Sequence, residues 1–188
     1  MTLQAYPIGV CKVCEKQFER VRPLQAVCGY RCANRLVKHQ ATAAKKAEQI
    51  VLARRKLAVK TIPQLIAEAQ FSFNAWVRQR DTDQPCICCG RFTENEMIRG
   101  GTWDAGHYRS RGSAGHLRFH PDNCHRQLKR CNTYGAKDYR GGLIARIGLD
   151  RVEALEANNA VHKWTREELI AIKHDYRARL RELQKGAT

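Results

Sequence analysis

Four polar residues have the side chains that hydrolysis of a phosphodiester bond requires: Asp104, His107, Asn123 and Asn132. Such hydrolysis needs a general base that activates water, and histidine is the side chain most often used for this. It also needs a cation at the leaving oxygen, and oxygen ligands suit Mg²⁺ or Mn²⁺. The residue types predict His107 as the base, with Asn123 orienting it through a hydrogen bond. They predict Asp104 and Asn132 as ligands of a catalytic Mg²⁺ or Mn²⁺ ion.

Two close pairs of cysteines lie near the N-terminus: Cys11, Cys14, Cys28 and Cys32. Zinc prefers four tetrahedral ligands, and two thiolate pairs from two turns can supply them. A site with four protein ligands has no open coordination position, so its zinc would be structural rather than catalytic. We predict a zinc module over residues 1–34, in which the metal stabilises a segment too small to fold on its own apolar core.

A second cysteine group is less complete and consists of Cys86, Cys89 and Cys131. A closing Cys-x-x-Cys pair would need a cysteine at position 128, where the chain has Leu128. The fourth ligand of a second structural zinc is therefore open. Cys124 is the first choice and His125 the second. Cys88 is the least favoured because it adjoins another ligand in the same turn, and a degenerate site without zinc is the alternative.

A basic helix is expected to connect these groups over residues 35–61. The segment is rich in alanine, lysine and arginine, has one acid, Glu48, and contains neither Gly nor Pro, as is typical of a helix. It is either a solvated connection or an arm that contacts phosphates. The residues predicted to bind DNA here are Lys45, Lys46, Arg54 and Arg55.

The remaining elements must position the polar residues. Pro63 and a three- and four-residue apolar spacing predict a helix that packs on the core. Short strands are expected at 103–109 and 117–120, and two short helices over 139–156 that are broken at Gly148. Thr165 and Glu168 form a capping-box pattern that begins a last helix. The predicted fold class is α+β, with a nuclease domain over 62–157 and a C-terminal helical segment over 158–188.

The composition points to an anionic partner inside the cell. The net charge is +16, from 34 Lys and Arg against 18 Asp and Glu, and nucleic acid is the commonest partner of so basic a chain. A ribosome-associated or membrane-surface protein is the alternative on charge alone. No stretch reaches the ~20 apolar residues of a membrane span. Nine cysteines, an odd number, and no signal peptide favour metal binding in the reducing cytoplasm.

Residues 81–150 resemble the NinG (Rap) family of phage recombination proteins, a branch of the HNH endonucleases, and the resemblance extends more loosely to both ends. The stretches that carry it are Trp103–Gly112, Leu117–Phe119, Asn123–Gln127, Cys131–Asn132 and Tyr139–Gly148. The resemblance implies a small ββα-metal core and a structure-specific endonuclease that cuts D-loops and Holliday junctions, in a phage or prophage of a bacterial host. It implies that His107 is the general base, that Asn123 orients it, and that Asn132 takes the last HNH position.

The chain departs from the family pattern before the motif histidine. An acid or histidine often ligates metal at that position, and this chain has Gly106. Asp104 lies two residues earlier, which places it on the same face of a strand, so we expect Asp104 to be the substitute ligand.

Three arginines around the motif are predicted to contact DNA phosphates, because arginine makes charge-assisted hydrogen bonds to phosphate. They are Arg109, Arg111 and Arg118. The expected partner is branched DNA, and symmetric cutting of a four-way junction would suit a homodimer. The rival interpretation is a non-catalytic, zinc-containing recombination accessory protein that binds nucleic acid. It explains the charge and the cysteines but gives the four polar residues no role.

Overall fold

The chain forms two compact units, and the boundary between them in the sequence lies between Lys60 and Thr61. The computed structural model describes residues 6–92, 101–135 and 138–186. Helices dominate both units, and two small two-stranded sheets accompany them, so the predicted mixture of helices and strands is confirmed. None of the described helices is both long and apolar enough to cross a membrane.

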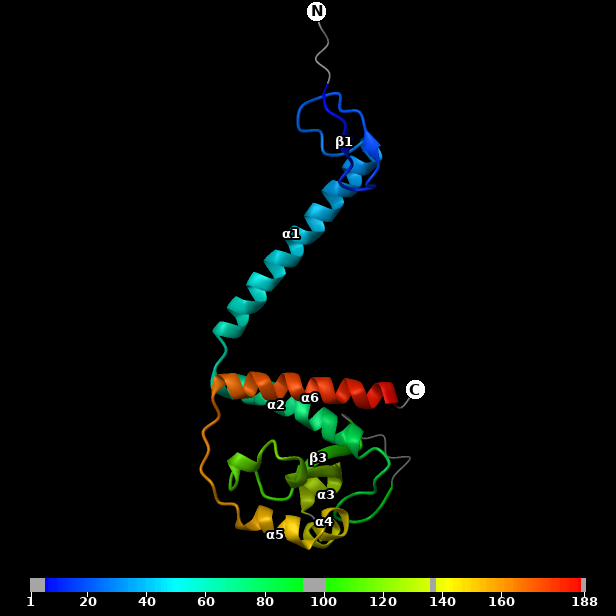
Figure 1. Cartoon of the computed structure of the whole chain (residues 1–188). Helices are drawn as coiled ribbons and strands as arrows, with labels where there is room; N and C mark the ends of the chain where they lie inside the picture. Colours follow the sequence, from blue (N-terminus) through cyan, green and yellow to red (C-terminus); the bar gives the residue numbers. More distant parts are fainter. Residues whose placement is uncertain (1–5, 93–100, 136–137, 187–188) are drawn as a thin grey trace, which may run out of the picture. The chain divides into compact units, whose positions relative to one another are not determined.

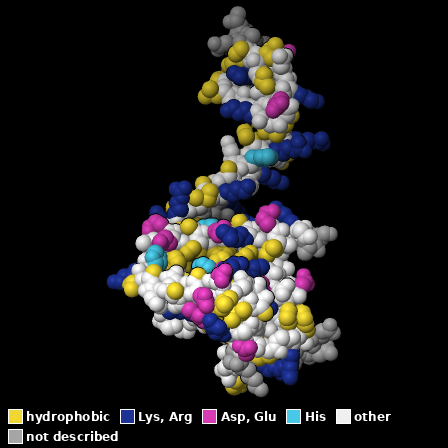
Figure 2. Space-filling model, turned by 60° about the horizontal axis from the view of Figure 1, so that its bottom comes forward, with side chains coloured by type: hydrophobic (Ala, Val, Ile, Leu, Met, Phe, Trp, Pro, Cys, Tyr) yellow, Lys and Arg dark blue, Asp and Glu magenta, His cyan; other side chains and the backbone are white. Residues whose placement is uncertain are grey.

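The first unit consists of a small sheet and one long helix. Strands β1 (Gly9–Val10) and β2 (Gln17–Phe18) pair antiparallel, and α1 (Tyr30–Ala58) follows (Figure 1). No described residue of α1 is buried. Packing against the described part of this unit therefore stabilises little of α1, and its alanine, lysine and arginine residues favour a helix by propensity. Figure 2 shows Lys and Arg side chains along α1, where Lys45, Lys46, Arg54 and Arg55 are exposed.

The second unit has a pair of packed helices on one side. Helix α2 (Ile62–Arg80) begins at a capping box formed by Thr61 and Gln64. Helix α6 (Arg166–Gly186) begins after Thr165 and runs beside α2 in the same direction (Figure 1). Phe73 of α2 packs edge-to-face on Tyr176 of α6, with ring centroids 4.8 Å apart. The C-terminal helix, predicted as a segment of its own, is thus part of the second unit.

A short hairpin lies next to α2. Strand β3 (Trp103–His107) pairs antiparallel with β4 (Cys124–Leu128), and helix α3 (Lys129–Tyr134) follows directly. The prediction of a strand at 117–120 is wrong, because Leu117 ends the 3-10 helix η1 (Gly115–Leu117) and a turn then leads to η2 (Pro121–Asn123). The β4 sequence, Cys-His-Arg-Gln-Leu, lacks a β-branched or apolar run, and only its partners in the folded unit explain why most of it is buried.

Helices α4 (Tyr139–Ile147) and α5 (Leu149–Ala157) are divided at Gly148, as predicted. Gly142 of α4 lies against the cysteine-bearing loop: a Cβ atom built there would be 1.7 Å from the carbonyl oxygen of Ile87. Only glycine lets α4 approach that loop so closely. The core between these parts contains Cys86, Ile87, Cys88, Ala114, Leu117, Leu128, Leu143, Val152 and Leu155.

Candidate active site and cysteine clusters

A pocket of about 390 Å³ lies beside β3 and contains three of the four predicted polar residues. Its lining consists of Asn74, Arg78, Asp104, Ala105, His107, Ser110, Arg111 and Asn132. Strand β3, the loop after it, α3 and α2 supply these residues. An imidazole, a carboxylate, amides, a hydroxyl and two guanidinium groups thus surround one space. This set of groups can hold a divalent cation and a phosphate.

The two predicted metal ligands are in direct contact. The side-chain Nδ2 of Asn132 donates a hydrogen bond to Oδ2 of Asp104, at 3.0 Å. Among the described residues, no other hydrogen bond or ion pair engages the Asp104 carboxylate. Oδ1 of each side chain therefore remains available, and such oxygen ligands fit Mg²⁺ or Mn²⁺ better than zinc.

The missing acid before His107 has a structural explanation. A Cβ atom at Gly106 would lie 1.8 Å from Oε1 of Gln127 and 3.1 Å from its Cβ. Gln127 is buried and lies opposite Asp104 in the hairpin. A side chain at position 106 would have to displace Gln127, so the carboxylate of this pocket comes from Asp104.

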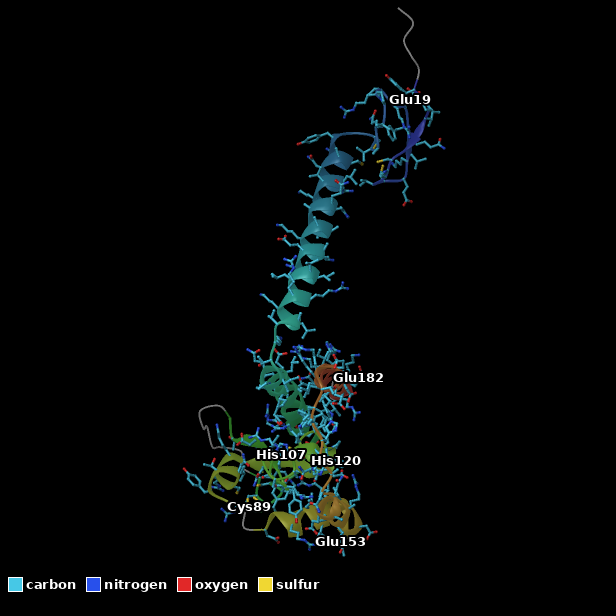
Figure 3. All side chains as sticks on the ribbon, turned by 90° about the vertical axis from the view of Figure 1, so that its left-hand side faces the viewer. Glu19, Cys89, His107, His120, Glu153 and Glu182 are labelled. Carbon is cyan, nitrogen blue, oxygen red and sulfur yellow. The ribbon has the colours of Figure 1, made fainter. Side chains whose placement is uncertain are left out.

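His107 lies among the side chains of the second unit (Figure 3), and a hydrogen bond defines the orientation of its imidazole. Its Nε2 lies 2.9 Å from the carbonyl oxygen of Arg118. A carbonyl only accepts hydrogen bonds, so Nε2 carries the proton of the neutral ring and Nδ1 keeps its lone pair. Burial, assisted by the positive charges of Arg111 and Arg118, lowers the pKa of His107 to about 4. The ring is therefore neutral at pH 7 and able to accept a proton.

Asn123 makes no hydrogen bond to His107 among the described residues, so the predicted orienting contact is absent. The side chain is fully buried. Its Oδ1 accepts from the backbone N–H of Arg109 at 2.8 Å, and its Nδ2 donates to the carbonyls of Arg109 (3.0 Å) and Leu117 (3.1 Å). Asn123 thus closes the loop that follows β3, and a backbone carbonyl, that of Arg118, orients His107 instead.

Replacing Asn123 by alanine is expected to destabilise the second unit. The change removes three hydrogen bonds of a buried side chain, of which the one to the Leu117 carbonyl is itself buried, and a buried group left without a partner costs about 1–3 kcal/mol. Urea unfolding followed by circular dichroism measures the loss, with the exposed Asn158→Ala as the control. Unchanged stability together with lost cutting would instead support the original, orienting role.

The three predicted DNA-binding arginines have different surroundings. The Arg109 guanidinium donates to the carbonyls of Leu155 (2.8 Å) and Asn158, and to Oδ1 of Asn159 (2.8 Å). These bonds tie the loop to the end of α5, so most of the Arg109 donors are engaged within the protein, and its DNA contact stays a prediction. Arg118 is half-buried, whereas Arg111 is exposed and lines the pocket.

The first cysteine group comes together as predicted. The sulfur atoms of Cys11, Cys14, Cys28 and Cys32 all lie within 4.8 Å of one another. The Cys14–Cys28 and Cys28–Cys32 distances are 3.7 and 3.6 Å, close to the ~3.8 Å edge of a tetrahedron of zinc–sulfur bonds. This cluster could hold a structural metal such as zinc.

The thiols of this first cluster also need a cation to ionise together. Burial raises the pKa of Cys11, but hydrogen bonds from backbone N–H groups, that of Cys14 foremost, outweigh it and lower the pKa to about 6. Hydrogen bonding to Cys28 and burial raise the pKa of Cys32 to about 12. One thiolate forms readily and hinders the next, which is the situation that a bound divalent cation relieves.

The second cluster contains Cys86, Cys88, Cys89 and Cys131. Sulfur–sulfur distances are 3.5 Å for Cys86–Cys88 and 3.7 Å for Cys89–Cys131. The backbone N–H of Leu128 donates to Sγ of Cys86 at 3.2 Å, so position 128 contributes through its backbone instead of a thiol. The fourth thiol is Cys88, which the sequence favoured least.

Cys124 and His125 are therefore not ligands of this cluster. Cys124 begins β4 opposite His107, with its Sγ 3.8 Å from Nδ1. The cluster adjoins the other end of β4, and four strand residues span about 13 Å. His125 is engaged elsewhere, with Nδ1 3.0 Å from Nη2 of Arg80 and 3.4 Å from the Asp81 carboxylate.

The sequence did not identify the contribution of α2 to the pocket. Asn74 and Arg78 lie four residues apart, beside the apolar stripe that packs α2 on the core. The apolar stripe predicts the helix and the face that packs on the core, but it gives no role to the polar residues beside it. Two polar residues at helical spacing next to such a stripe are the signal that could have indicated them.

Comparison with known proteins places the chain among phage proteins. A family model described as Bacteriophage Lambda NinG protein matches residues 5–186. Protein ninG of Escherichia phage lambda is 43% identical over 133 residues, which cover 69% of this chain and 62% of that protein. Protein ninG of Salmonella phage P22 is 42% identical over 133 residues, which cover 69% of this chain and 63% of that protein. The match thus spans less than two thirds of these relatives, and no solved structure matches the chain.

Proposed function

We propose that this chain, which belongs to the NinG family of bacteriophage proteins, is a metal-dependent DNA endonuclease of the HNH type. The observation that carries the proposal is the convergence of Asp104, His107 and Asn132 on one pocket. These residues come from a strand and from the helix that follows the hairpin. A base and an oxygen ligand pair in one space are what hydrolysis of a phosphodiester requires.

In this mechanism His107 accepts the proton of the attacking water at Nδ1. The Nε2–H bond to the Arg118 carbonyl keeps the ring in the required tautomer. The sulfur of Cys124 lies 3.8 Å from Nδ1 of His107. A thiol is a weak hydrogen-bond donor, so a water molecule can displace it and donate to the lone pair of Nδ1. Asp104 and Asn132 would hold a Mg²⁺ or Mn²⁺ ion, which when bound supplies positive charge at the leaving oxygen.

Branched DNA is the proposed substrate, and phage DNA in the bacterial cytoplasm is its proposed source. A net charge of +16 favours a polyanion. Helix α1 exposes Lys45, Lys46, Arg54 and Arg55 over a surface that no described residue of its unit covers. Symmetric cutting of a four-way junction would need two active sites, so a homodimer remains a prediction.

A non-catalytic DNA-binding accessory protein is the second candidate function. The two cysteine clusters and the exposed basic helix favour this function as much as they favour a nuclease. It leaves the Asp104–Asn132 contact and the neutral His107 without a role.

Cleavage of a DNA panel by the purified protein separates the two functions. Linear, forked, D-loop and four-way DNA are incubated with the protein in Mg²⁺, Mn²⁺ or EDTA. We expect nicks in the branched DNA with either metal ion and none in EDTA. Binding to branched DNA without cutting in any metal ion would favour the accessory protein.

The pH dependence of cutting is expected to follow the low pKa of His107. Its folded pKa of about 4 lies below the ordinary 6.5, so the base stays unprotonated as pH falls through 6.5. The cleavage rate at limiting substrate should therefore hold until about pH 5 and fall as pH approaches 4.

The same shift affects stability with a defined sign. The unfolded chain binds a proton at His107 below pH 6.5 and the folded chain does not, so stability declines as pH falls from 6.5 toward 4. The predicted pH dependence of the cleavage rate is checked by single-turnover cleavage at each pH, with DNA binding measured at the same pH values. An acid limb at pH 6.5 would show that the ring is solvated.

A further inference from the structure

Helix α2 brings two polar side chains, Asn74 and Arg78, to the wall of the pocket. Their neighbours Phe73 and Val77 are fully buried in the core. Packing of these neighbours fixes the helix, so Asn74 and Arg78 extend from a rigid backbone. Groups that must bind a substrate at a set position are best carried by such an element.

Hydrogen bonds orient Asn74 and connect it to the base. Nε2 of Gln70 donates to Oδ1 of Asn74 at 2.7 Å, and no described residue accepts a hydrogen bond from the Asn74 amide N–H groups. Gln70 is only 6% exposed, and its Oε1 accepts from Nη1 of Arg118 at 3.4 Å. The carbonyl of Arg118 in turn holds His107. One buried glutamine thus links the α2 wall to the residue that orients the base.

Arg78 and Arg111 are the cations of the pocket, and neither is neutralised within the described part of the chain. No hydrogen bond or ion pair engages either guanidinium among the described residues. Other arginines of this unit are held: Arg80 by Asp81, Arg140 by Glu156 and Arg151 by Asp122. Two unpaired cations face one carboxylate, that of Asp104, so the pocket has an excess of positive charge.

We infer that Arg78 and Asn74 form a phosphate-binding wall, which acts together with Arg111 of the same pocket, for the DNA strand that enters the pocket. Arginine binds phosphate through charge-assisted hydrogen bonds, often two at once, and the Asn74 amide adds neutral donors. Helix α2 is then a substrate-binding element as well as a core helix. This inference rests on the proposed nuclease function for the identity of the ligand as DNA.

The test measures DNA binding without cutting. Fluorescence anisotropy of forked DNA in EDTA, over a series of salt concentrations, is recorded for the full chain and for Arg78→Gln. Loss of one phosphate contact should weaken binding and reduce the slope of log K against log salt by about 1. Arg151→Gln is the matched control, because Asp122 already pairs with that exposed arginine, and its slope should equal that of the wild type.

A second readout separates this inference from the proposed function. In Mg²⁺, Arg78→Gln should slow single-turnover cleavage by about 10- to 100-fold, and Arg78→Lys, which keeps the charge, should lie between it and the wild type. An Arg78→Gln protein that is folded by circular dichroism and has wild-type slope and rate overturns the inference while the nuclease stands. If the salt slope of Arg78→Gln is reduced but the wild type cuts no DNA, the phosphate-binding wall is retained and the nuclease function is rejected.

Discussion

Cleavage of branched DNA is expected to fall by about 10²- to 10⁴-fold when His107 is replaced by alanine, with DNA binding unchanged. The imidazole is the only described histidine of the pocket lining, and its neutral form has a lone pair at Nδ1. Removing it takes away the group that accepts a proton from water. The phosphate-binding arginines and the oxygen ligands stay in place, so affinity for DNA should persist.

The control for this change is His174→Ala, because His174 is exposed on α6 and does not line the pocket. Single-turnover rates are measured in Mn²⁺ and Mg²⁺, and affinity for the same DNA is measured in EDTA. Thermal unfolding of both variants tests whether the second unit remains intact. Wild-type cutting by a folded His107→Ala protein would remove the proposed base and leave the reaction to another group.

Loss of one zinc ion per chain and unfolding of the second unit are expected for Cys88→Ala. The two clusters have four thiols each, so the wild type should contain two zinc ions. Binding of a structural zinc contributes about 10–16 kcal/mol in small zinc domains, which is comparable to the whole stability of a domain, about 5–15 kcal/mol. A site with three thiols should hold zinc much more weakly.

Cys124→Ala is the matched control, because it removes a buried thiol from the same unit without touching a cluster. Zinc is counted by elemental analysis of the dialysed proteins, and folding is followed by circular dichroism. Cys124→Ala should keep both zinc ions, apart from a modest loss of packing. Two zinc ions in Cys88→Ala and one in Cys124→Ala would instead support the ligand that the sequence favoured.

Local patterns were enough to predict much of the helical structure. The Thr165–Glu168 capping box begins α6 where expected, and Gly148 separates α4 from α5 because its φ of +86° suits glycine. The first cysteine group also follows from two close pairs of cysteines. In these cases a local pattern carries the prediction.

The hairpin could not be predicted as well, because its second strand lacks a local signal. The polar residues of β4 are buried only where distant residues receive them: Asp81 accepts from the backbone N–H of Arg126 at 2.9 Å, and Gln127 lies opposite Asp104. A period-two apolar pattern is the usual mark of a half-buried strand, and this segment has none.

The sequence by itself determined which chemical groups this protein carries: two sets of thiols, a histidine with an acid and amides around it, and an excess of cations. Only the tertiary structure decided which of them meet. It assigned Cys88 to the second cluster, Asn123 to the loop and Arg109 to the end of α5. The physical reason is that residue type and local backbone set what a side chain can bind, whereas strand register and packing set what lies within reach of it.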